Sequence, residues 1–264
     1  MSRDRRRERG ATVWLTGRRD ATHADGPSDR PRDHTETAAI AAHAIAVHSQ
    51  PGTTVCDPNC GNGSVVVEAV RLRRHAVGIA ADPDAWRAAR AALNAAKAHG
   101  APGDGTVLDR QPDRWTWTGL GPVDLILTVI GPVADGDGVD GPRADRLSTR
   151  IGGYRDLAGP RTLLVVIATY QLDGGLDLAS RIVAAGRAAG WRPVQRVVAL
   201  TAAFHTPPSD TWPPAPDRAW PAHRDVIIFG DDAQAGHPRP PRPFPSRPAP
   251  AADSPVGPAI RVAV

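Results

Sequence analysis

The sequence of 264 residues contains very few cysteines and no long apolar run. Its two cysteines, Cys56 and Cys60, are too few for a disulfide framework, and no second pair of ligands follows them at zinc-finger spacing. No stretch approaches the ~20 apolar residues of a membrane span, and the charged start, residues 1–9, leads into no apolar segment of signal-peptide length. These absences predict a cytoplasmic protein with reduced cysteines, no bound metal and no membrane association.

Lysine is almost missing, because Lys97 is the only one in the chain. The net charge of +4 and the pI of about 9.8 therefore depend on arginine. A planar guanidinium suits phosphate groups and stacks on bases, so DNA or RNA is a permissible partner. A GC-rich genome would produce a similar excess of Arg, Ala, Gly and Pro without any such partner, and the charge alone does not choose between the two explanations.

Short apolar segments alternate with alanine-rich helical patterns through the centre of the chain. We expect strands at 53–56, 75–80, 105–108, 123–129, 162–169, 194–201 and 225–229, and helices at 36–48, 64–72, 83–99 and 176–189. Residues 12–16 read as a short strand or an anchoring segment, and residues 131–160 as a glycine-rich loop. This alternation predicts an α/β fold around a buried, mostly parallel seven-stranded sheet, with an antiparallel hairpin of the last two strands at one edge.

The two ends of the chain differ in composition from this central part. Residues 1–11 are expected to form a disordered basic head, and residues 231–264 a disordered tail rich in Pro and Arg. One folded domain is thus predicted over residues 12–230.

A glycine-rich loop, Asp57-Pro58-Asn59-Cys60-Gly61-Asn62-Gly63, joins the strand at 53–56 to the next helix. Gly61 and Gly63 can take positive φ and let backbone approach a ligand closely. In open α/β sheets ligands bind beyond the carboxyl ends of the strands. The pattern is neither that of a dinucleotide site nor that of a P-loop, because an acid and a proline precede the glycines and no Gly-Lys-Ser follows. Asp57 would face a cationic or amine-bearing ligand.

This loop resembles the Asp-Pro-Phe-x-Gly-x-Gly-Thr signature of the amino-group DNA methyltransferases, which act on N4 of cytosine or N6 of adenine. The chain is especially similar to their tRNA-guanine-methyltransferase-like, "Trm-eleven-type" relatives. The resemblance extends from about residue 12 to 229 and includes the segments 13–20 and 223–229. It implies a Rossmann-like methyltransferase fold with S-adenosylmethionine as cofactor and DNA or RNA as substrate.

The resemblance also implies the cofactor-binding residues. Asp57, Pro58, Asn59, Cys60, Gly61 and Gly63 would surround the methionine part of S-adenosylmethionine. The family places an acid that binds both ribose hydroxyls where this chain has Ala80, and Asp82 either takes that role or is only the N-cap of the next helix. Asp109 matches the position that meets the adenine amino group, although it is also explained as a loop acid.

The catalytic motif of the family is altered in this chain. Its fourth strand normally ends in [Asp/Asn/Ser]-Pro-Pro-[Tyr/Phe], which orients an exocyclic amine and stacks on a flipped-out base. Here Val129 occupies the polar position, so Thr128 and Pro132 are the remaining candidates for catalysis. Tyr154, Trp212 or Trp220 would stack on the base or only pack in the core.

The glycine-rich segment after this strand carries several charges. Its arginines either meet phosphates or belong to a solvated loop that Asp residues balance; they are Arg143, Arg146, Arg150 and Arg155. Two functions remain: an active methyltransferase, or an inactive descendant that binds cofactor or nucleic acid in a regulatory role. Methylation of a small molecule is a third.

Overall fold

The computed structural model describes residues 12–16, 32–109, 120–131, 143–169, 178–201 and 223–230. The strands are β1 (Val13–Leu15), β2 (Thr54–Asp57), β3 (His75–Ala80), β4 (Gly105–Asp109), β5 (Val123–Ile130), β6 (Ala158–Ala168), β7 (Arg192–Leu200) and β8 (His223–Gly230). The helices are α2 (Arg32–His48), α3 (Ser64–Arg71), α4 (Pro83–Ala98), α5 (Arg143–Gly153), the 3-10 turn η3 (Tyr154–Leu157) and α6 (Leu178–Ala188). Within these ranges no helix is long and apolar enough to cross a membrane.

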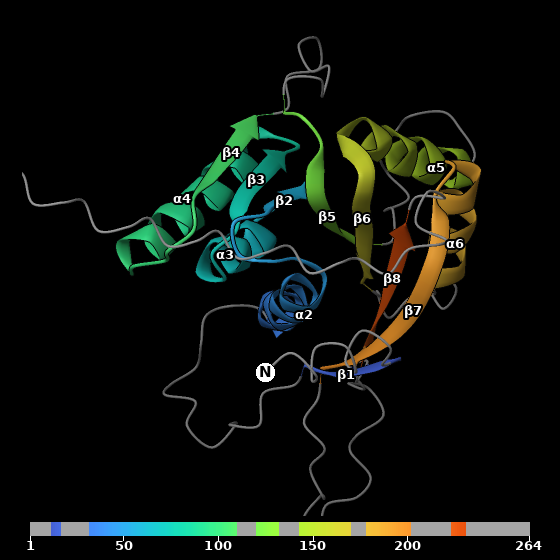
Figure 1. Ribbon diagram of the computed structural model, residues 1–264, viewed down its shortest axis with the longest axis horizontal. Helices are drawn as coiled ribbons and strands as arrows, with labels where there is room; N and C mark the ends of the chain where they lie inside the picture. Colours follow the sequence, from blue (N-terminus) through green and yellow to red (C-terminus); the bar gives the residue numbers. More distant parts are fainter. Residues whose placement is uncertain are drawn as a thin grey trace, which may run out of the picture.

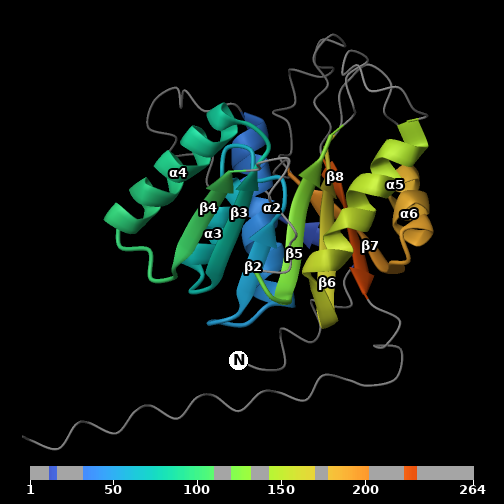
Figure 2. The ribbon, with the colours of Figure 1, turned by 90° about the horizontal axis from the view of Figure 1, so that it is seen from above.

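All the strands form one sheet in the order β1-β7-β8-β6-β5-β2-β3-β4 (Figures 1 and 2). Every pair is parallel except those of β8, which runs antiparallel to both β6 and β7. The predicted mostly parallel α/β sheet is confirmed. It has eight strands and not seven, because β1 adds to β7 at the edge. The predicted antiparallel pairing of the last two strands, β7 and β8, is confirmed, but the pair is not the edge of the sheet, because β1 pairs with β7 and β8 also pairs with β6.

Helices cover both faces of the sheet (Figure 1), and each face has its own hydrophobic core. Helices α2, α3 and α4 pack on one face, and α5 and α6 on the other. The central strands β5 and β6 are buried on both faces, which explains their nearly continuous apolar sequences. Their alternate residues enter opposite cores: Leu125 and Leu127 face α2 and α3, while Ile126 and Ile130 face α5 and α6.

The segment 131–160 differs most from its prediction as a loop. Its second half forms α5 and η3 and then the first residues of β6. Leu147, Ile151 and Tyr154 are buried at helical spacing, and this i, i+4, i+7 pattern holds α5 against the sheet. The glycines and charges of the segment masked these three apolar positions. The helix α2 also starts earlier than expected, at Arg32.

Two ion pairs connect β8 to its surroundings. Arg196 of β7 donates two hydrogen bonds to the carboxylate of Asp225, at 2.9 and 3.1 Å. On the other face of the sheet, Arg224 donates to Glu36 at the start of α2, at 3.4 Å. The last strand of the sheet is therefore joined both to its neighbour and to the first helix. The predicted head and tail, residues 1–11 and 231–264, lie outside the described residues.

Candidate functional site

The glycine-rich loop follows β2, near the middle of the sheet. β2 lies between β3 and β5, and the chain continues from β2 to β3 on one side but returns to β5 on the other. This is the switch point of an α/β sheet, where the loops after neighbouring strands separate and leave room for a ligand. The predicted loop is thus located where such folds bind their ligands.

Hydrogen bonds within the loop fix its shape. The Asn59 amide donates to the Asp57 carboxylate at 3.1 Å, and the Cys60 amide donates to the Ile79 carbonyl of β3 at 3.0 Å. Ser64, which starts α3, donates from its amide and its hydroxyl to the Asn62 side chain. The side chains of two loop residues, Pro58 and Cys60, are buried.

The two loop glycines have positive φ but different surroundings. Gly63, at φ 83°, caps α3, and a Cβ built there would lie 2.9 Å from the Cα of Ala89 in α4. Gly63 therefore permits two helices to pack closely. Gly61, at φ 45°, is exposed, and a Cβ built there would meet no atom within 4 Å. Its amide donates to no acceptor among the described residues. Gly61 is the loop position open to a ligand.

Asp57 ends β2 with a side chain that is only 2% exposed. Burial raises the pKa of this carboxyl to about 7, although the Asn59 amide, the Thr128 hydroxyl and the Arg150 guanidinium all favour the charged form. The sequence predicted Asp57 as an acid facing a cation. In the structure it is a buried acid whose charge changes near neutral pH.

The predicted catalytic residue Thr128 lies beneath this acid. Its side chain is 0% exposed, and its hydroxyl lies against both Asp57 and the phenol of Tyr154. Within the described residues this buried hydroxyl has no hydrogen-bond partner, and it is not exposed to a substrate. The other predicted catalytic residue, Pro132, lies outside the described residues, as do Trp212 and Trp220.

Tyr154 is buried, and its hydroxyl accepts a hydrogen bond from Arg150 Nε at 3.1 Å. It packs in the core and has no free ring face for a base. Arg150 and Tyr154 belong to the helical segment that the sequence did not predict, so their place beside Asp57 was missed. Arg155, expected on a loop, lies with its guanidinium 5.1 Å from the ring centroid of Trp191.

The two other predicted acids lie at the carboxyl ends of β3 and β4. Asp82 is the N-cap of α4, and its Oδ1 accepts hydrogen bonds from the amides of Asp84 and Ala85 at 2.9 and 2.8 Å. Asp109 ends β4 and is exposed beside Ala80 in the strand register. Asp57, Asp82 and Asp109 thus follow three adjacent strands along one edge of the sheet. The capping role explains Asp82 without a ligand.

The end of β5 provides few acceptors for an amine. Val129 has no polar side chain, and the carbonyl of Ile130 already accepts a hydrogen bond from the Thr169 amide at 2.9 Å. Gly131 closes the described part of this segment. The chemistry expected from the family's tetrad is therefore not provided by these residues.

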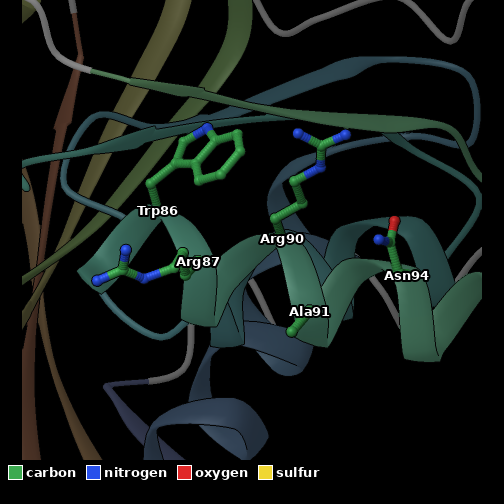
Figure 3. Close-up of a pocket in the computed structure, with 5 residues that line it drawn as sticks. All are labelled: Trp86, Arg87, Arg90, Ala91 and Asn94. Atoms are coloured by element: carbon green, nitrogen blue, oxygen red, sulfur yellow. The ribbon is translucent and has the colours of Figure 1, made fainter. Parts of the chain in front are cut away.

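A shallow hollow of about 330 Å³ lies on α4 (Figure 3). Trp86 and Arg90 form its main feature, with the Arg90 guanidinium 4.8 Å from the centroid of the indole. The indole is held by a hydrogen bond from its Nε1 to the Val107 carbonyl of β4, at 3.2 Å. The hollow is lined by Trp86, Arg87, Arg90, Ala91 and Asn94. None of the predicted site residues lines it.

Groups that could hold a metal are missing from the described ranges, where no three His, Cys, Asp or Glu side chains cluster suitably. Cys56 and Cys60 are buried, and burial raises the pKa of both thiols. Protonated, buried thiols are poor ligands and poor nucleophiles.

A known structure shares this arrangement of strands and helices. The magnesium protoporphyrin IX methyltransferase from Synechocystis PCC 6803, solved with bound SAH, superposes with a TM-score of 0.52 at 13% identity, covering 78% of this chain and 90% of that chain. The fold is that of the class I S-adenosylmethionine-dependent methyltransferases. A precorrin-6y C5,15-methyltransferase from Geobacter metallireducens GS-15 gives a TM-score of 0.49 at 14% identity, covering 75% of this chain and 87% of that chain. No family model matches the sequence. No curated protein matches it either.

Proposed function

We propose that this chain is an S-adenosylmethionine-dependent methyltransferase that acts on an exocyclic amino group of a base in DNA or RNA. The observation that carries the proposal is the exposed, positive-φ Gly61 in the loop that follows the buried acid Asp57 at the switch point of a methyltransferase fold. Gly61 has a positive φ, and no atom lies near the position of a Cβ. A glycine in this conformation lets a ligand approach the backbone closely.

The residues fit this cofactor at its methionine end. Asp57 would bind the ammonium group, and the Gly61 amide is available for a polar atom of the ligand. The adenosine end is less complete, because Ala80 is fully buried and has no carboxylate for the ribose. Asp109, the neighbour of Ala80 in the register, is the acid nearest to that end in the sheet. S-adenosylmethionine, when bound, supplies an activated methyl group, and these residues would hold it in a fixed orientation.

DNA or RNA is the proposed substrate class for two reasons. The chain has a pI of about 9.8, and Trp86 with Arg90 presents an anchored indole beside a guanidinium on the surface of α4. Aromatic and arginine side chains together suit stacked bases and phosphates.

A second function is favoured by the end of β5. Val129 has no polar side chain, and the Ile130 carbonyl already accepts one hydrogen bond, so the described residues at the end of β5 offer few acceptors to orient an amine. An inactive protein that binds cofactor or nucleic acid in a regulatory role accounts for the same loop without methyl transfer.

Calorimetry with S-adenosylmethionine tests the loop at Gly61. We expect the wild-type protein to bind in the micromolar range and Gly61→Arg to lose binding, because the added side chain would fill the open space. Gly100→Arg is the matched control: Gly100 also has positive φ, 82°, and no atom within 4 Å of a built Cβ, but it ends α4 far along the chain from the loop. Equal loss in both variants would contradict a binding site at Gly61.

A second arm of the experiment separates the two functions. Tritiated S-adenosylmethionine is incubated with the protein and with genomic DNA or tRNA. Label in either nucleic acid supports the methyltransferase. Cofactor binding without label in either supports the regulatory alternative. Absence of cofactor binding would exclude the methyltransferase and any regulatory role that depends on the cofactor.

A further inference from the structure

Four side chains from four elements meet beneath the end of β2. Asp57 comes from β2, Thr128 from β5, Arg150 from α5 and Tyr154 from η3. Thr128 lies against both Asp57 and Tyr154, and Arg150 acts electrostatically on Asp57 and donates to Tyr154. Asp57, Thr128 and Tyr154 are almost fully buried, whereas Arg150 is only half-buried. The cluster thus connects a buried acid to a cation that reaches the surface.

Arg150 uses only part of its hydrogen-bonding capacity inside the protein. Its Nε donates to the Tyr154 hydroxyl, which fixes the plane of the guanidinium. Its two terminal nitrogens donate to no acceptor within the described ranges. A guanidinium with a fixed plane and two available nitrogens is arranged for a carboxylate, which accepts two parallel hydrogen bonds.

The methionine part of the cofactor carries both charges that this pair complements: an ammonium and a carboxylate on one carbon. We propose that Arg150 binds the carboxylate of S-adenosylmethionine while Asp57 binds its ammonium group, so that the pair recognises the zwitterion. This inference rests on the proposed cofactor. The proposal adds Arg150 of α5 to the site. The glycine-rich loop itself contains no positively charged side chain.

A simpler role for Arg150 would be to keep Asp57 charged, without touching the ligand. The two roles differ in which ligands they affect. A carboxylate contact matters only for ligands that have the carboxylate, whereas a loss of charge on Asp57 would weaken every ligand that has the ammonium group. Measurement at pH 8.5, above the pKa of about 7 for Asp57, keeps this acid charged and isolates the contact.

The experiment compares S-adenosylmethionine with its decarboxylated analogue, which keeps the ammonium group, by calorimetry at pH 8.5. We expect wild type to bind S-adenosylmethionine about tenfold to hundredfold more tightly than the analogue, as for one charged hydrogen-bonded pair. Arg150→Gln should lose this preference while binding the analogue as wild type does. Arg150→Lys, which keeps the charge but not the fork, should retain part of it.

Arg187→Gln is the matched control, because it removes an exposed arginine from α6 in the same layer of helices. It should keep the full preference, and thermal denaturation shows that each variant is folded. Equal weakening of both ligands by Arg150→Gln, or no preference in wild type, would overturn the inference. Failure of wild type to bind either ligand would instead remove the proposed function itself, and the inference with it.

Discussion

At Asp57, folding and the proposed binding of a cation make opposite demands on one carboxyl. It is almost fully buried at the end of β2, and burial raises its pKa to about 7 from an ordinary value of 3.8. A cationic ligand favours the charged form, whereas the empty protein favours the neutral form. Above neutral pH, Asp57 therefore carries a buried negative charge that is unfavourable for the folded state.

We predict that Asp57→Asn changes the pH dependence of stability. Between about pH 4 and pH 7 the folded state holds a proton that the unfolded state has released, so the wild-type free energy of unfolding falls as the pH rises through this window. Asparagine has no charge to bury. Thermal denaturation at pH 5 and pH 8 should show the melting temperature of the variant rising relative to wild type, while calorimetry at pH 8 should show weaker binding of S-adenosylmethionine.

The control for this prediction is Asp84→Asn, since Asp84 is exposed on the first turn of α4. Its melting temperature relative to wild type should stay nearly constant between the two pH values. A constant difference for Asp57→Asn as well would mean that Asp57 does not titrate in this range.

Single residues of the site were partly predictable from the sequence. Asp57, Gly61 and Gly63 were placed correctly at the end of a strand and on the loop before a helix, because such a loop is a local pattern. Their different roles were not predicted, since only the packing of α3 on α4 shows that Gly63 faces Ala89 while Gly61 is open. The partnership of Arg150 with Asp57 was also out of reach, because it depends on a contact between residues far apart in the chain.

The residue before α4, Asp82, has two competing roles, as a helix cap and as a ligand contact. Asp82 caps this helix through two amide hydrogen bonds and precedes Pro83 at its first turn. The family resemblance offered a ribose contact for the same side chain. The geometry accounts for the carboxylate by the cap alone.

We predict that Asp82→Ala lowers the free energy of unfolding by about 1 kcal/mol, as loss of an N-cap does. Asp82→Ser keeps a capping oxygen and should restore most of this stability. Urea denaturation measures both variants. Asp82→Ser should also bind S-adenosylmethionine as tightly as wild type, and a stable serine variant with weakened binding would show that the carboxylate contacts the cofactor.

The helix α5 shows where prediction of elements failed. Glycines and charged residues surround the buried Leu147 and Ile151 of α5 and the buried Tyr154 of the following turn η3, and they outweigh these apolar positions in a local pattern. The strands β5 and β6, in contrast, were predicted because burial on both faces leaves a continuous apolar sequence. An element that packs on the core through only a few apolar residues is therefore hard to predict from the sequence.

On the scale of the whole molecule, the short strand β1 closes one edge of the sheet. Trp14 is 2% exposed, and its ring lies 4.6 Å from that of His43 in α2. β1 also pairs with β7, which would otherwise present an open edge. Three residues thus connect the edge of the sheet to the first helix.

We predict that Trp14→Ala lowers the free energy of unfolding by about 3–5 kcal/mol, the range for removing a buried aromatic side chain. Exposure of the β7 edge should also increase aggregation, which size-exclusion chromatography measures. Leu15→Ala, at a neighbouring position that is 66% exposed, should change stability by less than about 0.5 kcal/mol. Similar effects of the two substitutions would show that β1 is not anchored through Trp14.

The strand order as a whole was predicted only in outline. Alternating strands and helices indicated a parallel sheet, but the place of β8 depends on pairing between distant segments, which no local pattern specifies. Its apolar sequence in fact agrees with an interior position, because Val226 and Ile228 face one core and Ile227 and Phe229 the other.

The interior position of β8 has a consequence for how the protein is made. β8 follows β6 and β7 in the chain, yet each of them pairs with β8 and not with the other. While the ribosome is still adding residues before 223, the growing chain can hold β2 to β6 in one sheet and β1 with β7 in another piece. These two sets of strands form one sheet only after β8 has left the ribosome and has paired with β6 on one side and β7 on the other.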